Sequence, residues 1–262
     1  MNGQGTVSYS EGFFARQSGG SLASARLVAP LVVDLIHPRS VVDVGCGVGA
    51  WLRAFRDLGC GEVRGVDGDW VPRDKLMIDP AAFVAADLAH PPNLGQRFDL
   101  AISVEVGEHL PAARSRAFVE YLTGLSEHVL WSAAIPFQGG SNHINERWPD
   151  YWFGLFAARG YVCFDLFRAR FWNHPDMRWW YAQNLLLYVT HAQLAAIERA
   201  TGAVPYADSA PPCFVHPERY ASLARNVHYP ELITPRKLVS AAIKSARQRL
   251  RARRKVKGPN PG

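Results

Sequence analysis

Two glutamates and a histidine stand close together in the stretch SVEVGEHL, at the end of an apolar run of strand length. Glu105, Glu108 and His109 are spaced i, i+3 and i+4, so they would share one face if a helical turn follows the strand. Two carboxylates and an imidazole that converge in this way could hold a hard divalent cation such as Mg²⁺ or Mn²⁺. Without a cation, the two acids would repel each other.

A further histidine, His143, follows in the stretch IPFQGGSNHINERWPDYW. Coordination to a cation would lower the pKa of an alcohol, as it does for bound water, and would make the alcohol a better nucleophile. Without a metal, His143 or His109 would serve as the general base, because imidazole titrates near neutral pH. Both mechanisms stay open, and Glu105, Glu108, His109 and His143 are the catalytic candidates.

The elements that must position these residues alternate between strand-length apolar runs and helix-length segments. This order predicts an α/β fold with a Rossmann-like, doubly wound parallel sheet. Two later runs predict an antiparallel pair at the edge of the sheet. The expected strands are 40–45, 62–67, 82–87, 98–104, 128–135, 160–172 and 183–190, and the expected helices are 50–59, 111–125 and 149–160.

A glycine-rich turn, DVGCGVG, follows the first predicted strand. Glycines let the backbone approach a ligand closely, and the helix N-terminus that follows offers free N–H groups. Asp67 ends the second strand, where a carboxylate can accept hydrogen bonds from both hydroxyls of a ribose. Asp87 ends the third strand, beside the expected place of a purine. These strand ends predict a nucleotide site.

The motifs DVGCGVG, GVDGDW and AADL together resemble the class I S-adenosylmethionine-dependent methyltransferases. The resemblance implies a seven-stranded sheet and S-adenosylmethionine as the cofactor. Residues 1–24 are an expected N-terminal arm; because residues 9–24 precede the first core helix and offer Tyr9, Gln17, Ser21 and Ser24, they are expected either to fold over the cofactor as a lid or to pack elsewhere. The implied cofactor-binding residues are Gln17, Asp43, Gly45, Gly47, Asp67, Gly68, Trp70, Asp87, Leu88 and Ser103.

SVEVGEHL also resembles the metal-binding segment of small-RNA 2′-O-methyltransferases and of ubiquinone-pathway O-methyltransferases. The RNA enzymes add a distant histidine, and His143 is its counterpart here, at a different spacing from His109. The resemblance implies a Mg²⁺ site of Glu105, Glu108, His109 and His143. Methyltransferases that use no metal carry a similar motif, in which the histidine packs against the protein.

The loop after the fifth strand is dense in polar residues, which indicates substrate contacts. Amides, carboxylates and aromatic faces suit a polyhydroxylated acceptor. The expected substrate-binding residues are Gln138, Gly139, Gly140, Asn142, Asn145, Glu146 and Tyr181.

The stretches QSGGSLASARLVAPLVVDLI, AAIPFQGGSNHINERWPDYW and WWYAQNLLLY resemble a bacterial branch of methyltransferases associated with cell-surface polysaccharide synthesis. This branch includes the mycobacterial sugar 1-O-methyltransferases of methylmannose polysaccharide synthesis. The resemblance implies O-methylation of a mannoside or oligosaccharide, assisted by Mg²⁺. Methylation of an RNA 2′-hydroxyl or of a small phenolic metabolite is the alternative, and a non-enzymatic cofactor-binding protein is a third reading.

The charge is unevenly distributed. Past Glu231 there is no acidic residue, whereas residues 235–258 hold ten Lys and Arg; the remainder has 19 basic and 23 acidic residues, a net charge of −4. An acidic body argues against a nucleic-acid partner. The expected domains are a methyltransferase domain, 25–200, and an extension, 201–262. The extension is expected to hold a basic amphipathic helix that could touch a membrane surface or a partner. An oligomer is possible.

Four scattered cysteines and the lack of a signal peptide predict a cytoplasmic protein with reduced thiols. No apolar run of membrane-spanning length is expected, because Asp34 interrupts RLVAPLVVDLI.

Overall fold

The computed structural model describes residues 11–228, and the side chains of residues 19–225. Two compact units make up the chain, Met1–His216 and Pro217–Gly262. The described part of the second unit is one helix, α8 (Pro217–His228). The predicted basic helix beyond it, around Val239 to Leu250, lies outside the described residues.

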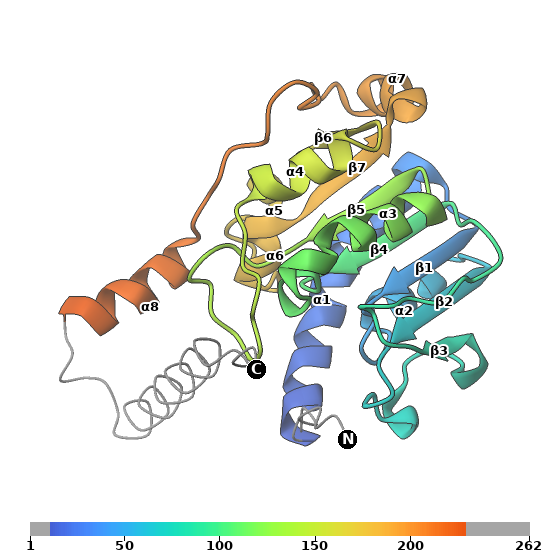
Figure 1. Ribbon diagram of the computed structural model, residues 1–262, viewed down its shortest axis with the longest axis horizontal. Helices are drawn as coiled ribbons and strands as arrows, with labels where there is room; N and C mark the ends of the chain where they lie inside the picture. The colour runs from blue at the N-terminus through green and yellow to red at the C-terminus, as the bar shows by residue number, and fades with distance from the viewer. Residues whose placement is uncertain (1–10, 229–262) are drawn as a thin grey trace, which may run out of the picture. The chain divides into compact units, whose positions relative to one another are not determined.

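The first unit is built on a seven-stranded sheet with the order β3-β2-β1-β4-β5-β7-β6 (Figure 1). Strands β1 to β5 run parallel, and β7 pairs antiparallel with both β5 and β6. The predicted α/β, Rossmann-like, doubly wound sheet with an antiparallel edge pair is confirmed. The strands are β1 (Ser40–Val44), β2 (Glu62–Asp67), β3 (Phe83–Ala85), β4 (Leu100–Val104), β5 (His128–Ser132), β6 (Tyr161–Phe164) and β7 (Leu186–Thr190).

Helices cover both faces of this sheet, because successive strand residues point to opposite sides. Val41 of β1 belongs to one hydrophobic cluster and Val42 to the other. The first cluster holds α1 (Glu11–Ile36), α2 (Ala50–Asp57), α5 (Arg168–Phe171), α6 (Trp179–Asn184) and α7 (His191–Thr201). The second holds α3 (Ser115–Leu125) and α4 (Pro149–Ala157), which lie over the other face (Figure 1). Short 3-10 turns are Arg73–Lys75, Pro80–Ala82, Gly107–His109 and Ala112–Arg114.

Helix α1 differs from the predicted separate arm. Residues 11–24 are its first half, so the expected boundary at residue 24 falls inside one continuous helix. By length and composition, Gly19–Ile36 could cross a membrane despite Asp34, which corrects the expectation from the sequence. However, Val28 and Val32 are fully buried in the first hydrophobic cluster, as in a core helix.

The predicted strand 160–172 is wrong beyond Phe164, because the chain turns into helix α5 there. The Asp165 carboxylate accepts two hydrogen bonds from the buried Arg168 guanidinium, 2.7 and 3.0 Å long, which holds the turn. Arg168 also donates to the carbonyl oxygen of Pro212. Tyr206 pairs with Cys163 through both backbone hydrogen bonds. Residues 201–216 therefore pack on the domain, and the structural boundary lies at residue 216 rather than 200.

Candidate active site

The glycine-rich turn connects β1 to α2 with three glycines at positive φ, of which Gly45 has φ +90°. A Cβ on Gly45 would collide with the side chain of Val106, so the close approach of these two segments requires glycine. Asp43, two residues earlier, is buried, and neither carboxylate oxygen has a hydrogen-bond partner among the described residues. Burial, and then the charge of Asp67, raises the pKa of Asp43 well above its usual range. An unpartnered buried carboxylate fits a site whose ligand supplies the missing donors.

Asp67 lies at the end of β2, next to this turn. Its carboxylate accepts hydrogen bonds from the backbone N–H of Gly47, at 2.7 Å, and of Gly68, at 2.6 Å. Burial raises the pKa of Asp67, and the two backbone hydrogen bonds partly offset that effect. The strand order places β1, β2 and β3 side by side, so the predicted cofactor residues on their ends share one edge of the sheet.

The other predicted cofactor residues occupy different environments. The ring of Trp70 covers Gly68, and Trp70 is half exposed, while Leu88 is buried. Asp87 is exposed; the backbone N–H of Ala89 and then His90 lower its pKa. Ser103 is buried, and its hydroxyl donates to the carbonyl oxygen of Val44, which joins β4 to β1. Gln17 lies in α1, but its side chain is outside the described residues.

The segment after β4 differs from the predicted α-helical turn. Glu105 adopts a left-handed conformation with φ +56°, and Gly107–His109 form a 3-10 turn. The backbone N–H groups of Ile144 and Asn145 both donate to the carbonyl oxygen of Glu108. These two bonds bring the loop after β5 back to the end of β4, and His143 comes with it.

Glu108, His109 and His143 form a compact group. Their nearest ligand atoms all lie within 4.8 Å of one another, and His143 Nε2 is 3.9 Å from Glu108 Oε1. The two imidazole rings meet edge to face, with centroids 4.9 Å apart. Burial, and then the neighbouring His143, lowers the pKa of His109 to about 4. Three of the four predicted metal ligands are therefore together.

Glu105, the fourth predicted ligand, is not part of this group. One carboxylate oxygen accepts from Gln138 Nε2 at 2.6 Å, and the other accepts from Asn184 Nδ2 at 3.0 Å. Burial raises the pKa of Glu105 to about 7, although the amide donors favour the charged form. The Glu105 carboxylate is a neighbour of Glu108. Burial is the main cause that raises the pKa of Glu108, and the negative charge of Glu105 is the second.

The group fits a divalent cation. Glu108 is fully buried, and neither of its oxygens makes a hydrogen bond with good geometry to any described residue. Across the described part of the chain, no Lys or Arg forms an ion pair with Glu105, Glu108 or Glu146. Buried carboxylates without a partner are costly, and a metal ion is a usual partner. Imidazole and carboxylate are both ordinary ligands of divalent transition metals.

The loop that carries His143 closes tightly on the ring. Gly140 has φ +150°, and a Cβ at this position would overlap the His143 imidazole. Gly139 and Asn142 are exposed and also lie at positive φ. Only glycine allows both the conformation and the close contact at position 140.

Three of the predicted substrate residues are buried and engaged within the protein. The amide oxygen of Gln138 accepts from Gln183 and Asn184, Asn145 donates to Ser115, and the Tyr181 hydroxyl hydrogen-bonds with Ser21. Glu146 binds the loop backbone rather than facing solvent. Of the predicted set, Gly139, Gly140 and Asn142 remain exposed.

Asn184 has a role that the sequence did not assign to it. The sequence places it in an aromatic and amide cluster suited to a substrate, but its amide donates to Glu105. The available signal was a polar pair, Gln183 and Asn184, directly before an apolar strand that pairs with β5. Together with Gln138, this pair forms a buried amide network under Glu105.

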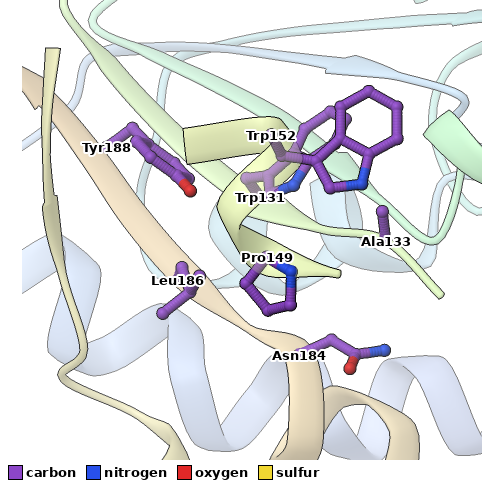
Figure 2. Close-up of a pocket in the computed structure, with 7 residues that line it drawn as sticks. All are labelled: Trp131, Ala133, Pro149, Trp152, Asn184, Leu186 and Tyr188. Atoms are coloured by element: carbon purple, nitrogen blue, oxygen red, sulfur yellow. The ribbon is translucent and has the colours of Figure 1, made fainter. Parts of the chain in front are cut away.

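Asn184 also lines a small cavity with six other residues (Figure 2). The indoles of Trp131 and Trp152 lie across the cavity from Asn184. Neither Trp152 Nε1 nor the Tyr188 hydroxyl has a hydrogen-bond partner among the described residues. The lining, completed by Ala133, Pro149 and Leu186, includes none of the predicted cofactor, metal or substrate residues. Through Asn184, which donates to Glu105, this cavity adjoins the candidate active site.

Comparison with known protein families identifies a methyltransferase domain over residues 21–194, about two thirds of the chain. The chain belongs to this methyltransferase family. The matched region contains the glycine-rich turn, Asp67 and the group around Glu108. The chain is accordingly a methyltransferase that uses S-adenosylmethionine.

The chain is also similar to one curated relative and to solved structures. A "Probable tocopherol O-methyltransferase, chloroplastic" of Oryza sativa subsp. japonica is 32% identical over 85 residues, which are 29% of this chain. The match spans about a quarter (24%) of that relative's length. Two solved structures share the fold, each with a TM-score of 0.50. Streptomyces venezuelae DesVI is 15% identical, and the match covers 70% of this methyltransferase and all of DesVI. CalS10, an amino pentose methyltransferase from Micromonospora echinaspora bound to S-adenosylmethionine, is 16% identical, and the match covers 71% of this chain and 99% of CalS10.

Proposed function

We propose that this methyltransferase transfers the methyl group of S-adenosylmethionine to a sugar hydroxyl, with a divalent cation held by Glu108, His109 and His143. The observation that carries the proposal is the fully buried carboxylate of Glu108, which has no hydrogen-bond partner among the described residues and faces two imidazoles. Glu108 and His109 follow β4 and His143 lies in the loop after β5, at the carboxyl edge of the sheet where open α/β folds bind their ligands.

The ligand set favours Mn²⁺ over the Mg²⁺ that the motifs imply. Mg²⁺ prefers oxygen ligands, whereas imidazole suits transition metals. Here His109 and His143 supply nitrogen, and Glu108 supplies oxygen. Glu105 adds negative charge nearby without belonging to the group. Both ions are hard enough to accept the oxygens of an acceptor in their remaining positions.

The protein's own part in the reaction is mainly positioning. The sulfonium already activates the methyl group, so the chain must place an acceptor oxygen in line with it. A bound cation would lower the pKa of a coordinated hydroxyl. Glu108, His109 and His143 would fix where that oxygen lies, while Gln138 and Asn184 hold the Glu105 carboxylate beside them. Should no cation be needed, His143 is the proposed general base.

A sugar acceptor is favoured by the loop over this group. Gly139, Gly140 and Asn142 offer exposed polar backbone and amide groups. Phe137 and Trp148, at the two ends of the loop, are 74% and 38% exposed. Flat aromatic faces of this kind pack against sugar C–H groups. The motif resemblance to polysaccharide-associated methyltransferases supports a mannoside or oligosaccharide, and the acidic body disfavours RNA.

Methyl transfer from labelled S-adenosylmethionine to a panel of acceptors tests this proposal. The panel holds mannosides, other mono- and disaccharides, a short RNA and a catechol, each assayed with Mn²⁺. We expect label in a saccharide and none in the RNA. The Glu120→Gln variant, changed at an exposed position of α3, should behave like the wild type. Label in the RNA or the catechol alone would contradict a sugar acceptor.

A further inference from the structure

The carboxylate of Glu146 accepts three hydrogen bonds from one short loop. Its Oε1 accepts from the backbone N–H of Gly139, at 2.7 Å, and from His143 Nδ1, at 3.0 Å. Its Oε2 accepts from the backbone N–H of Phe137, at 2.8 Å. Bonds from a donor to a carboxylate are among the stronger hydrogen bonds of proteins. Glu146 therefore links both ends of the segment 137–143.

The bond to His143 selects one form of the imidazole. A carboxylate only accepts hydrogen bonds, so the Nδ1 atom of His143 must carry the proton. In the neutral ring this leaves the lone pair on Nε2. That atom lies 3.9 Å from Glu108 Oε1, on the side of the proposed cation. Metal-binding histidines usually have such a carboxylate behind the ring.

The loop backbone needs this anchor. Phe137 adopts a left-handed conformation with φ +66°, which is unfavourable for its large side chain and persists where the surroundings enforce it. Asn142, with φ +61°, is of a residue type that tolerates this conformation. Glu146 fixes the backbone on either side of Gln138, and Gly140 then lies against the His143 ring.

We propose that Glu146 is a positioning residue, which holds the loop 137–143 in place and fixes the Nδ1-protonated form of His143. Its effect on the cation is exerted through the orientation of the His143 ring. The inference rests on the proposed function, since it concerns the same cation site. Glu146 therefore supports the site from behind His143, whereas the sequence predicted that it binds the acceptor.

The test compares Glu146→Gln with the wild type in three measurements. A glutamine presents one oxygen and one N–H₂ group, so it cannot accept from all three donors. Mn²⁺ affinity, measured by electron paramagnetic resonance, should fall about 10- to 100-fold. Histidine ¹⁵N chemical shifts of the metal-free protein should show His143 losing its single Nδ1-protonated form. S-adenosylmethionine affinity by calorimetry should stay unchanged, as it should in the exposed control Asp150→Asn.

A cycle with His143→Ala separates positioning from general damage to the fold. In the His143→Ala background, Glu146→Gln should weaken Mn²⁺ binding no further. If Glu146→Gln does not fold, Glu146→Asp replaces it, because the shorter side chain cannot reach all three donors.

Two results would overturn the inference. The first is a Glu146 variant that binds Mn²⁺ as tightly as the wild type while Glu108→Gln and His143→Ala bind it weakly. That result would refute the role of Glu146 and leave the cation site standing. Unchanged Mn²⁺ affinity in all three variants would refute the cation site itself, and the role of Glu146 with it.

Discussion

Replacing Glu108 by glutamine should lower the turnover number about a hundredfold or more and leave the affinity for S-adenosylmethionine unchanged. The substitution keeps the size of the side chain but removes the carboxylate that would bind the cation together with the two imidazoles. Losing one group that stabilises developing charge in an active site commonly costs about 10²–10³ in rate. The cofactor should bind normally, because Glu108 is not among its predicted residues, most of which lie near the ends of β1, β2 and β3. Single-turnover kinetics and calorimetry measure the two effects separately.

The melting temperature distinguishes this functional role from a structural one. Neither oxygen of Glu108 makes a hydrogen bond with good geometry to a described residue, and the weaker interaction with the backbone N–H of Ala134 can also be made by the glutamine oxygen. We therefore expect the melting temperature to move by less than about 4 °C, which corresponds to roughly 1 kcal/mol in a domain of this size. Glu120→Gln is the matched control on the surface of α3. Full activity in Glu108→Gln, or a lost fold, would contradict the assignment.

Replacing Asp67 by alanine should weaken S-adenosylmethionine binding about a hundredfold, which corresponds to about 2.7 kcal/mol. The carboxylate holds the backbone N–H groups of Gly47 and Gly68, so its removal releases the glycine-rich turn. It is also the predicted acceptor for the ribose hydroxyls. Hydrogen bonds to a charged group contribute about 1.5–3 kcal/mol each, and calorimetry can measure such a loss.

A cofactor analogue separates the two roles of Asp67. Wild-type protein should bind the 2′-deoxy form of S-adenosylhomocysteine more weakly than S-adenosylhomocysteine itself. In Asp67→Ala, the two ligands should bind equally, since the residue that would recognise the hydroxyl is gone. Asp69→Asn, at an exposed carboxylate two residues away, is the matched control and should keep wild-type affinity. An unchanged preference in Asp67→Ala would place the ribose elsewhere.

The sheet was predictable because its signals are local. Apolar runs, a glycine-rich turn and an acidic residue at the end of the second strand each fall within a few residues of sequence. They predicted the parallel sheet and the antiparallel edge, which the structure confirms. Predicting that His143 lies near Glu108 required one more general rule, that neighbouring parallel strands end at the same edge of a sheet.

The details of the site were not predictable because they depend on distant contacts. Asn184 donates to Glu105 from 79 positions away, and no sequence pattern relates the two residues. Glu105 has a left-handed backbone conformation and is followed by a 3-10 turn rather than the predicted α-helical turn. The Glu105 carboxylate therefore does not join the group of Glu108, His109 and His143. Likewise, polar density in the loop suggested substrate contacts, whereas Gln138 and Asn145 are buried in hydrogen-bonded networks.

Chelation tests the central claim, that a divalent cation at Glu108, His109 and His143 assists methyl transfer, most directly. The measurement is the rate of label transfer to the best saccharide acceptor after treatment with EDTA, and again after addition of Mn²⁺ or Mg²⁺. We predict that the rate falls to the level of Glu108→Gln and recovers on adding back the metal, more fully with Mn²⁺. An unchanged rate in EDTA, together with complete loss of activity in His143→Ala, would contradict the claim and make His143 the general base.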